Sequence, residues 1–308
     1  MNAWRAFGAR PRVALVAPAS AVPEEMVEEA VRRLEALALD VRPGRHLGAR
    51  DGPWAGSVAQ RAADLTWALT DPEIDIVWLA RGGEGTAAAA ARVPWQRARC
   101  GPRPVLGMSD ATFLHGALSR RGWPSVHAAM PAVRVGWDAF AAGAAISALR
   151  AGPGWTLPWP EGWPKARALR PGQAVGPVVG GNLTCLGAAL GTPLRPRTRG
   201  SILLLEDVGE AAYRLDRVLT QLSQSGILRS VAGVLLGTFT DCPPSGGLAV
   251  EAVLERHVGG LGVPVLAGLP LGHGPVQSAL PLGVPCRLDA DKGSLTLLEA
   301  PAGAARAG

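Results

Sequence analysis

A serine at a predicted strand-to-helix turn is the residue of this sequence best suited to nucleophilic chemistry. The segment 104–118 reads PVLGMSDATFLHGAL, with apolar residues typical of a strand end, then Gly107, then Ser109 and Asp110. Gly107 permits a sharp turn, and Ser109 and Asp110 can start a helix. A serine hydroxyl at a helix N-terminus lies beside free backbone N–H groups that can stabilise an oxyanion. Because Ser and Asp also cap helices, a purely structural role is the alternative.

A glycine-rich loop at residues 80–85 (ARGGEG) is the second candidate for chemistry. It follows an apolar strand predicted over 74–79 and leads into an alanine-rich helix that starts near Thr86. The loop could cradle a phosphate, but it has neither the Walker lysine nor the spacing of a dinucleotide-binding loop. It could equally supply a backbone N–H to an oxyanion hole, or form only a tight turn.

The elements that must position these loops alternate along the first half of the chain. Short apolar strands are predicted over 12–17 and 74–79, and amphipathic helices over 23–39 and 58–69. Such alternation predicts a doubly wound α/β domain, in which a parallel sheet is covered on both faces. The loops at the carboxyl ends of its strands then form the site.

The second half of the chain predicts a smaller α/β or barrel-like domain. Residues 152–172 are rich in Pro, Trp and Gly. We therefore expect a semi-rigid junction over 136–172, between an N-terminal domain at 1–135 and a C-terminal domain at 173–308. Beyond the junction, strands are predicted over 175–179, 202–205, 231–236 and 263–266, helices over 180–190, 211–225 and 253–258, and a hairpin over 286–298.

Composition and charge exclude several other classes of protein. The formal net charge of +6 comes mostly from arginines that are scattered along the chain, so no nucleic-acid partner is expected. No apolar run is long enough to span a bilayer, and residues 1–12 do not resemble a signal peptide, so we expect a cytoplasmic protein without a membrane partner. The four cysteines form no CxxC pair, and no set of His, Cys, Asp or Glu has metal-ligand spacing. Neither a metal nor another cofactor is expected.

Several ordered motifs together resemble those of the LD-carboxypeptidase family of serine peptidases, which includes the muramoyltetrapeptide carboxypeptidases. Each motif is weak alone, but their order and spacing are specific, and they span nearly the whole chain. The motifs are Val16–Pro18 (VAP), Ala80–Gly83 (ARGG) with Gly85, Gly107–Asp110 (GMSD) with Thr112 and His115, Gly180–Leu183 (GGNL), Leu205–Asp207 (LED) with Arg214, Asp216 and Arg217, Gly272–Pro275 (GHGP), and Leu280–Gly283 (LPLG).

The resemblance implies a two-domain fold whose second domain is a swivelling barrel, a site at the domain interface, and often a homodimer. It also implies a Ser-His-Glu triad with Ser109 as nucleophile, His273 as base and Glu206 as acid. The backbone N–H groups of Asp110 and Gly83 would form the oxyanion hole. The residue chemistry agrees, because a serine hydroxyl needs a base, and a carboxylate can orient an imidazole and stabilise its charged form.

Other titratable residues could take these roles. His127, which follows a predicted strand, is the main alternative base. Glu210 is the alternative acid, although it should lie beyond the strand end. We interpret His115 as a packed, hydrogen-bonded helix residue, and we expect Asp207 and Asp110 to cap or orient. The remaining histidines, His46 and His257, are expected at the surface.

Two departures from the family pattern concern the substrate more than the reaction. Glu84 stands where the family usually has an aromatic residue, and Ala128 and Ala129 replace the usual Gly-Pro after a histidine. Glu84 could pair with a cationic group of the substrate, or simply face solvent. Arg81 and Asn182 are the other candidates for substrate binding.

The resemblance implies a cytoplasmic serine carboxypeptidase that releases terminal D-alanine from murein tetrapeptides during peptidoglycan recycling, with a small peptide or muropeptide as substrate. Two alternatives stay open. A related self-immunity hydrolase would cleave a peptide–nucleotide antibiotic of the microcin C type with the same triad. A two-domain small-molecule binding protein would hold a ligand in the glycine-rich loops without chemistry.

Overall fold

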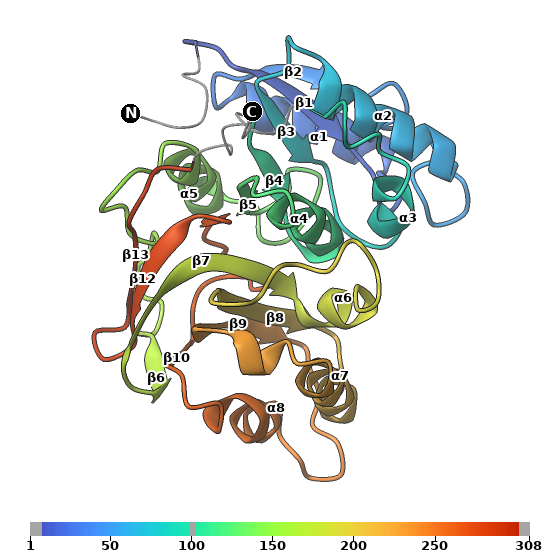
Figure 1. The fold of residues 1–308 in the computed structure, drawn as a ribbon. Coiled ribbons are helices and arrows are strands. Elements are labelled where there is room, and N and C mark those ends of the chain that lie inside the picture. Colours follow the sequence, from blue (N-terminus) through green and yellow to red (C-terminus); the bar gives the residue numbers. More distant parts are fainter. Residues whose placement is uncertain (1–7, 99–102, 302–308) are drawn as a thin grey trace.

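Two β-sheets lie one above the other in the computed structural model, which describes residues 8–98 and 103–301 (Figure 1). Helices cover both faces of the first sheet and one face of the second. The chain therefore has the mixed α/β fold with two domains that the sequence predicts.

The first sheet has six strands in the order β11-β5-β4-β3-β1-β2. Five of them run parallel: β1 (Arg12–Val16), β2 (Asp40–Pro43), β3 (Ile76–Leu79), β4 (Val105–Gly107) and β5 (Ser125–His127). All four residues of β3 are buried, as expected of a strand that is covered on both faces. The predicted doubly wound sheet is thus present, and the carboxyl ends of its parallel strands meet at one edge.

Five helices cover this sheet. Helices α1 (Glu24–Glu35) and α5 (Ala139–Leu149) pack on one face, and α2 (Val58–Thr70), α3 (Thr86–Ala90) and α4 (Thr112–Ser119) pack on the other. In α1, the buried residues Met26, Ala30 and Leu34 recur at four-residue spacing and form the stripe that faces the sheet. The helix predicted over 23–39 ends earlier, at Glu35, and a turn follows in which Ala38 has a φ of 60°.

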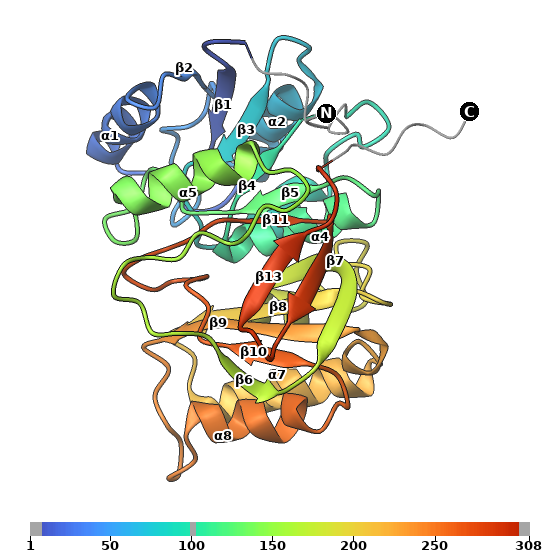
Figure 2. The same ribbon diagram turned by 90° about the vertical axis from the view of Figure 1, so that its left-hand side faces the viewer.

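The second sheet has seven strands in the order β13-β12-β7-β8-β9-β10-β6. Its centre is parallel and consists of β7 (Gln173–Asn182), β8 (Ile202–Val208), β9 (Gly233–Thr240) and β10 (Val265–Ala267). Antiparallel strands complete both ends: β6 (Arg167–Arg170), β12 (Pro285–Asp289) and β13 (Ser294–Leu297). Figure 2 shows how the sheet curls, with β12 and β13 turned over the central strands.

Three helices cover the convex face of the second sheet: α6 (Leu183–Ala188), α7 (Ala212–Gln224) and α8 (Val250–Leu254). A short 3₁₀ turn at Leu228–Ser230 follows α7, and α8 continues as a π-helix over Glu255–Gly259. Apolar side chains of the central strands and of β12 and β13 fill the inside of the curl. This is the barrel-like second domain.

Strand β11 (Leu280–Leu282) crosses from the second half of the chain to the first sheet, where it pairs antiparallel with β5. No strand is predicted here from the sequence, because Pro281 has no N–H to donate. A proline is nevertheless tolerated on an edge strand such as this one. We propose domain boundaries at 1–135, 136–172 and 173–308. Strand β11 lies in the last of these segments but pairs with the first sheet.

Within the described residues, no helix combines the length and the apolar character that crossing a bilayer requires. The described cysteines are free thiols: Cys185, Cys242 and Cys286. Cys100 lies outside the described residues.

Candidate active site

Ser109, which is partly buried, has the backbone geometry expected of a nucleophile at a strand-to-helix turn. It follows β4 after a single residue and opens a 3₁₀ turn over Ser109–Ala111 that leads directly into α4. Its φ is +62°, a left-handed conformation that non-glycine residues rarely adopt and that suits a strained nucleophile elbow. A β-carbon at Gly82 would lie 2.9 Å from Oγ of Ser109. The glycine therefore lets its loop approach the serine closely.

Two hydrogen bonds hold the end of the glycine-rich loop, one to the serine turn and one to the segment after β1. Oδ2 of the buried Asp110 accepts a hydrogen bond of 2.7 Å from the backbone N–H of Thr86, the first residue of α3. The hydroxyl oxygen of Ser20 accepts one of 3.1 Å from the backbone N–H of Glu84. Burial raises the pKa of Asp110, although the hydrogen bonding to Thr86 opposes that shift. These contacts hold the residues that follow Gly83, whose φ is +110° and which lies against Ser20.

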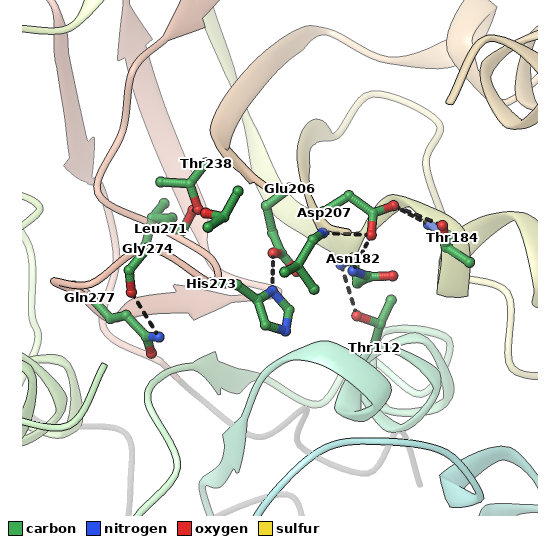
Figure 3. A network of polar contacts seen from close by, with 12 residues as sticks. Thr112, Asn182, Thr184, Glu206, Asp207, Thr238, Leu271, His273, Gly274 and Gln277 are labelled. Carbon is green, nitrogen blue, oxygen red and sulfur yellow. Dashed lines mark hydrogen bonds and ion pairs between the residues drawn. The ribbon is translucent and has the colours of Figure 1, made fainter. Parts of the chain in front are cut away.

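His273 and Glu206 form a hydrogen-bonded pair (Figure 3). Nδ1 of His273 lies 2.7 Å from Oε2 of Glu206. Because an ionised carboxylate only accepts hydrogen bonds, Nδ1 carries the proton and Nε2 is free to accept another. The Glu206 side chain is wholly buried, whereas that of His273 is 20% exposed. Glu206 lies inside β8, which continues to Val208, rather than just after the strand as predicted.

Charge and burial act in opposite directions on this pair. Burial alone would raise the pKa of Glu206, but the imidazoles of His127 and His273 outweigh it and hold the pKa well below its usual range. Burial alone would lower the pKa of His273, but the hydrogen bond and charge of Glu206, with the charge of Asp207, raise it. Glu206 is therefore ionised at neutral pH, and it makes His273 a stronger base.

The serine turn and the His273–Glu206 pair meet at the boundary between the two sheets. Met108, which precedes the serine, lines the same cavity of about 390 Å³ as His273. The backbone N–H of Asn182 donates a hydrogen bond of 3.0 Å to Oγ1 of Thr112, in the first turn of α4. Asn182 on β7 is also the register neighbour of Glu206 on β8. The segments that carry the three predicted triad residues therefore border one interface.

The Asn182 side chain is held by groups of the protein, as Figure 3 shows. Its Oδ1 accepts from the backbone N–H of Cys185, and its Nδ2 donates to Asp207 at 2.9 Å. Asp207 also accepts from the backbone N–H and the hydroxyl of Thr184. Asp207 thus orients neighbouring groups, as expected, and Asn182 keeps one amide hydrogen for another acceptor.

The two other predicted binding residues lie on the glycine-rich loop. Nη1 of Arg81 donates a hydrogen bond of 2.9 Å to the carbonyl oxygen of Ala21, which ties the loop to the segment after β1. The Glu84 side chain is exposed. A bound molecule would therefore meet the Glu84 carboxylate more readily than the Arg81 guanidinium.

His115 is a structural residue, as predicted. It is buried, its Nε2 donates to the carbonyl oxygen of Gly107, and its Nδ1 accepts from the hydroxyl of Ser125. Burial lowers its pKa to about 3, so the ring is neutral. Both ring nitrogens are occupied, and His115 has no atom left for the serine.

The expectation that His46 and His257 lie at the surface is wrong. Their side chains are only 24% and 14% exposed, because each ring packs against a carboxylate. His46 lies 2.8 Å from Asp64 on α2, and His257 lies 2.9 Å from Asp216 on α7. Both rings therefore have structural partners of their own.

The alternative base, His127, and the alternative acid, Glu210, lie in different surroundings. His127 is wholly buried at the end of β5, with Nε2 4.0 Å from Oε1 of Glu206. Glu210 lies beyond β8, as predicted, and contacts Arg214 at 3.7 Å. Gln277, which no motif singled out, also lines the cavity beside His273. Its position four residues after His273 in the same loop is the signal that could have pointed to it.

This arrangement suits acyl transfer. A serine at a sharp turn, an imidazole held by a carboxylate and backbone N–H groups of two adjoining loops are the parts that such chemistry requires. In the stretches 8–98 and 103–301, no three His, Cys, Asp or Glu side chains are grouped to hold a metal ion.

Comparison with known proteins matches both halves of the chain to one family. The LD-carboxypeptidase N-terminal domain matches residues 13–128, and the LD-carboxypeptidase C-terminal domain matches residues 175–288. A Streptomyces coelicolor protein provisionally named a carboxypeptidase is 43% identical over 300 residues, which cover 93% of each chain. The murein tetrapeptide carboxypeptidase of Pseudomonas aeruginosa is 37% identical over 296 residues, which cover 91% of this chain and 94% of the relative.

Solved structures share the fold over nearly the whole chain. The muramoyltetrapeptide carboxypeptidase of Oxalobacter formigenes has a TM-score of 0.80 at 28% identity, with 92% of this chain and 98% of the other covered. The microcin C7 self-immunity protein without ligand has a TM-score of 0.86 at 19% identity, with 96% and 98% covered. At that identity the second likeness describes the fold alone.

Proposed function

The chain belongs to the LD-carboxypeptidase family, and from that premise we propose that it is a serine carboxypeptidase acting on murein tetrapeptides. The reaction is hydrolysis of the L,D-peptide bond that precedes the terminal D-alanine. The observation that carries the proposal is the 2.7 Å contact between Nδ1 of His273 and Glu206, which leaves Nε2 of His273 as a free base beside the cavity. The murein tetrapeptide carboxypeptidase relative supports the choice of substrate.

In the first half of the reaction, Ser109 attacks the carbonyl carbon of the scissile bond. Nε2 of His273 takes the hydroxyl proton as the Oγ–C bond forms. The ionised Glu206 stabilises the resulting imidazolium and stays ionised itself. When the C–N bond breaks, His273 returns the proton to the amine of the departing D-alanine, and the shortened peptide stays on Ser109 as an ester.

In the second half, water takes the place of the serine hydroxyl. His273 removes a proton from the water as it attacks the ester, and then returns that proton to Oγ of Ser109. The products are the tripeptide and the free enzyme. In both halves the negative oxygen is stabilised by the backbone N–H groups of Asp110 and Gly83, whose loops are joined by the Asp110–Thr86 hydrogen bond.

Substrate binding falls to residues around the glycine-rich loop and β7. The exposed Glu84 would pair with the free amino group of the diamino acid in the peptide. Asn182 would offer its remaining amide hydrogen, and Arg81 would hold the loop through its bond to Ala21. On the family resemblance alone, we further propose a cytoplasmic homodimer that works in peptidoglycan recycling, and light scattering of the purified protein tests the dimer.

The microcin C7 self-immunity protein of Escherichia coli is 25% identical in sequence over 318 residues, and this relative supports one second candidate, a hydrolase of a peptide–nucleotide antibiotic. The same three residues would cleave the acyl linkage, so only the substrate differs. A comparison of kcat/KM on three compounds separates the candidates: a disaccharide tetrapeptide ending in D-alanine, its epimer ending in L-alanine, and an aminoacyl-sulfamoyl adenylate. We expect turnover of the first alone. Preference for the adenylate would replace the proposed function, and turnover of none would favour a binding protein without chemistry.

A further inference from the structure

His127 and Glu206 face each other across the boundary between the two sheets. His127 ends β5 in the first sheet, between Gly107 on β4 and Leu280 on β11. Glu206 lies on β8 of the second sheet. Nε2 of His127 is 4.0 Å from Oε1 of Glu206, and neither side chain is exposed to solvent. Two ionisable groups are therefore buried against each other in the middle of the molecule.

Three polar atoms of this pair lack a hydrogen bond. Among the described residues, Nδ1 and Nε2 of His127 and Oε1 of Glu206 are buried without a partner. A buried polar group without a partner is costly, and native proteins satisfy most of them. The other oxygen of Glu206 is already committed to His273. A hydrogen bond between Nε2 of His127 and Oε1 of Glu206 would satisfy one unpaired atom of each side chain.

We propose that His127 is a positioning residue that holds the free oxygen of Glu206 while the other oxygen holds His273. The inference rests on the proposed role of the His273–Glu206 pair in activating Ser109. A hydrogen bond needs about 3 Å between heavy atoms, so the two side-chain atoms need to approach by about 1 Å to complete the contact. Nε2–H of His127 then donates to Oε1 of Glu206.

This contact ties the proposed acid of the second domain to the first domain. Glu206 belongs to the second domain, and His127 belongs to the strand next to the one that leads into Ser109. A carboxylate that accepts a hydrogen bond at each oxygen cannot rotate freely, and it offers His273 an acceptor in a fixed position. Without His127, Glu206 keeps its bond to His273 but loses its restraint from the first domain. The rate of serine activation falls, whereas substrate binding is little affected.

Three substitutions isolate the proposed contact. In His127→Gln an amide nitrogen can take about the position of Nε2. In His127→Asn the amide nitrogen takes about the position of Nδ1 instead, and His127→Leu has no side-chain nitrogen. His257→Gln is the matched control, because His257 also contacts a carboxylate at 2.9 Å but lies on the second domain away from the cavity. Circular dichroism and thermal unfolding identify the folded variants. If His127→Leu does not fold, the Gln and Asn variants, which differ by one methylene, decide the outcome.

The first readout is the rate at which a fluorophosphonate probe labels Ser109, which requires no knowledge of the substrate. The second is kcat and KM on the tetrapeptide. We expect His127→Leu and His127→Asn to lower labelling and kcat by about 10- to 100-fold, the usual effect of losing a hydrogen bond to a charged group, with KM within about threefold. His127→Gln and His257→Gln should stay within about threefold of the wild type.

The outcomes distinguish this inference from the proposed function. Wild-type labelling of a folded His127→Leu or His127→Asn variant overturns the role of His127 alone, as does a His127→Gln variant that falls as far as His127→Asn. If the wild-type protein is labelled but does not cleave the tetrapeptide, the proposed substrate is wrong. The labelling rates of the His127 variants then still test the positioning role. A wild-type protein that is not labelled refutes the nucleophile, and the positioning role with it.

Discussion

The carboxylate of Asp110 accepts a hydrogen bond of 2.7 Å from the backbone N–H of Thr86. The residue that follows Ser109 therefore also holds the first turn of α3 and the end of the glycine-rich loop. One side chain joins the two segments whose backbone N–H groups we propose as the oxyanion hole. A disturbance of this bond should affect the transition state more than substrate binding.

We predict that Asp110→Ala lowers kcat by about 10- to 100-fold, because the loss of an oriented oxyanion donor has an effect of about this size or larger. Asp110→Asn keeps an oxygen that can accept from Thr86, and it should stay within several-fold of the wild type. Steady-state kinetics on the tetrapeptide measure the difference. Equal losses in both variants would mean that the charge of Asp110, rather than its hydrogen bond, is what matters.

Asp138→Ala is the matched control for this experiment. Asp138 caps α5 by accepting a 2.7 Å hydrogen bond from the backbone N–H of Ala141, and α5 lies on the face of the first sheet opposite α4. Loss of a cap reduces stability by about 1 kcal/mol. We therefore expect a lower unfolding temperature with an unchanged kcat.

Glu206→Gln should preserve the fold and lower kcat by about 10²- to 10⁴-fold. The amide fills the same buried space but cannot stabilise an imidazolium by charge. If its NH₂ group faces His273, it donates to Nδ1 and favours the tautomer in which Nε2 carries the proton. Asp216→Asn, which removes the charge beside His257, is the control and should leave kcat unchanged. Activity of Glu206→Gln within tenfold of the wild type would contradict the proposed role of Glu206.

The pH dependence of kcat/KM should report the basicity of His273. The ring must be neutral to take the serine proton, and its pKa is raised above the ordinary 6.5 because the hydrogen bond and charge of Glu206 outweigh the effect of burial. Activity should therefore fall as the pH drops through a value above 6.5. In Glu206→Gln, ¹H NMR titration of the ring should give a lower pKa than in the wild type. An acid limb at or below pH 6.5 in the wild type would refute this assignment.

Gly272→Ala should disable the site by direct contact. Gly272 has a φ of +114°, and a β-carbon there would lie 2.6 Å from Oε2 of Glu206 and 2.8 Å from Oγ1 of Thr238. We expect a loss in kcat of at least about tenfold, because Oε2 is the oxygen that holds His273. Gly172→Ala is the control, since its φ of +123° carries a similar backbone strain and its nearest contact is the ring of Pro264 at 3.3 Å. Equal kinetic effects would show that backbone strain alone is responsible.

Much of the fold follows from local patterns that a single sequence contains. The buried run of β3 and the four-residue spacing in α1 depend only on neighbours along the chain, so both elements are predicted close to where they lie. Strand β11 is missed because Leu280–Leu282 is short and contains a proline, and only its pairing with β5 makes it a strand. The predicted end of β8 is early because Glu206 and Asp207 are polar, although both are buried by the rest of the fold.

The site is predicted less completely than the fold. The strand–turn–helix pattern around Ser109 is local, and the structure adds the positive φ that such a turn requires. The contact between His273 and Glu206 is long-range, and only the resemblance to a family suggested it. Nothing in the spacing of the sequence reveals that His127 approaches the opposite oxygen of Glu206, because the two residues belong to different sheets.

The proposed carboxypeptidase activity of Ser109 is tested most directly by following a disaccharide tetrapeptide by mass spectrometry in the presence of the wild-type protein and of Ser109→Ala, which should share the same fold. We expect the wild type to remove one alanine and Ser109→Ala to remove none. Removal of alanine at a similar rate by both proteins, or by neither, would contradict the role of Ser109 as the nucleophile of a carboxypeptidase.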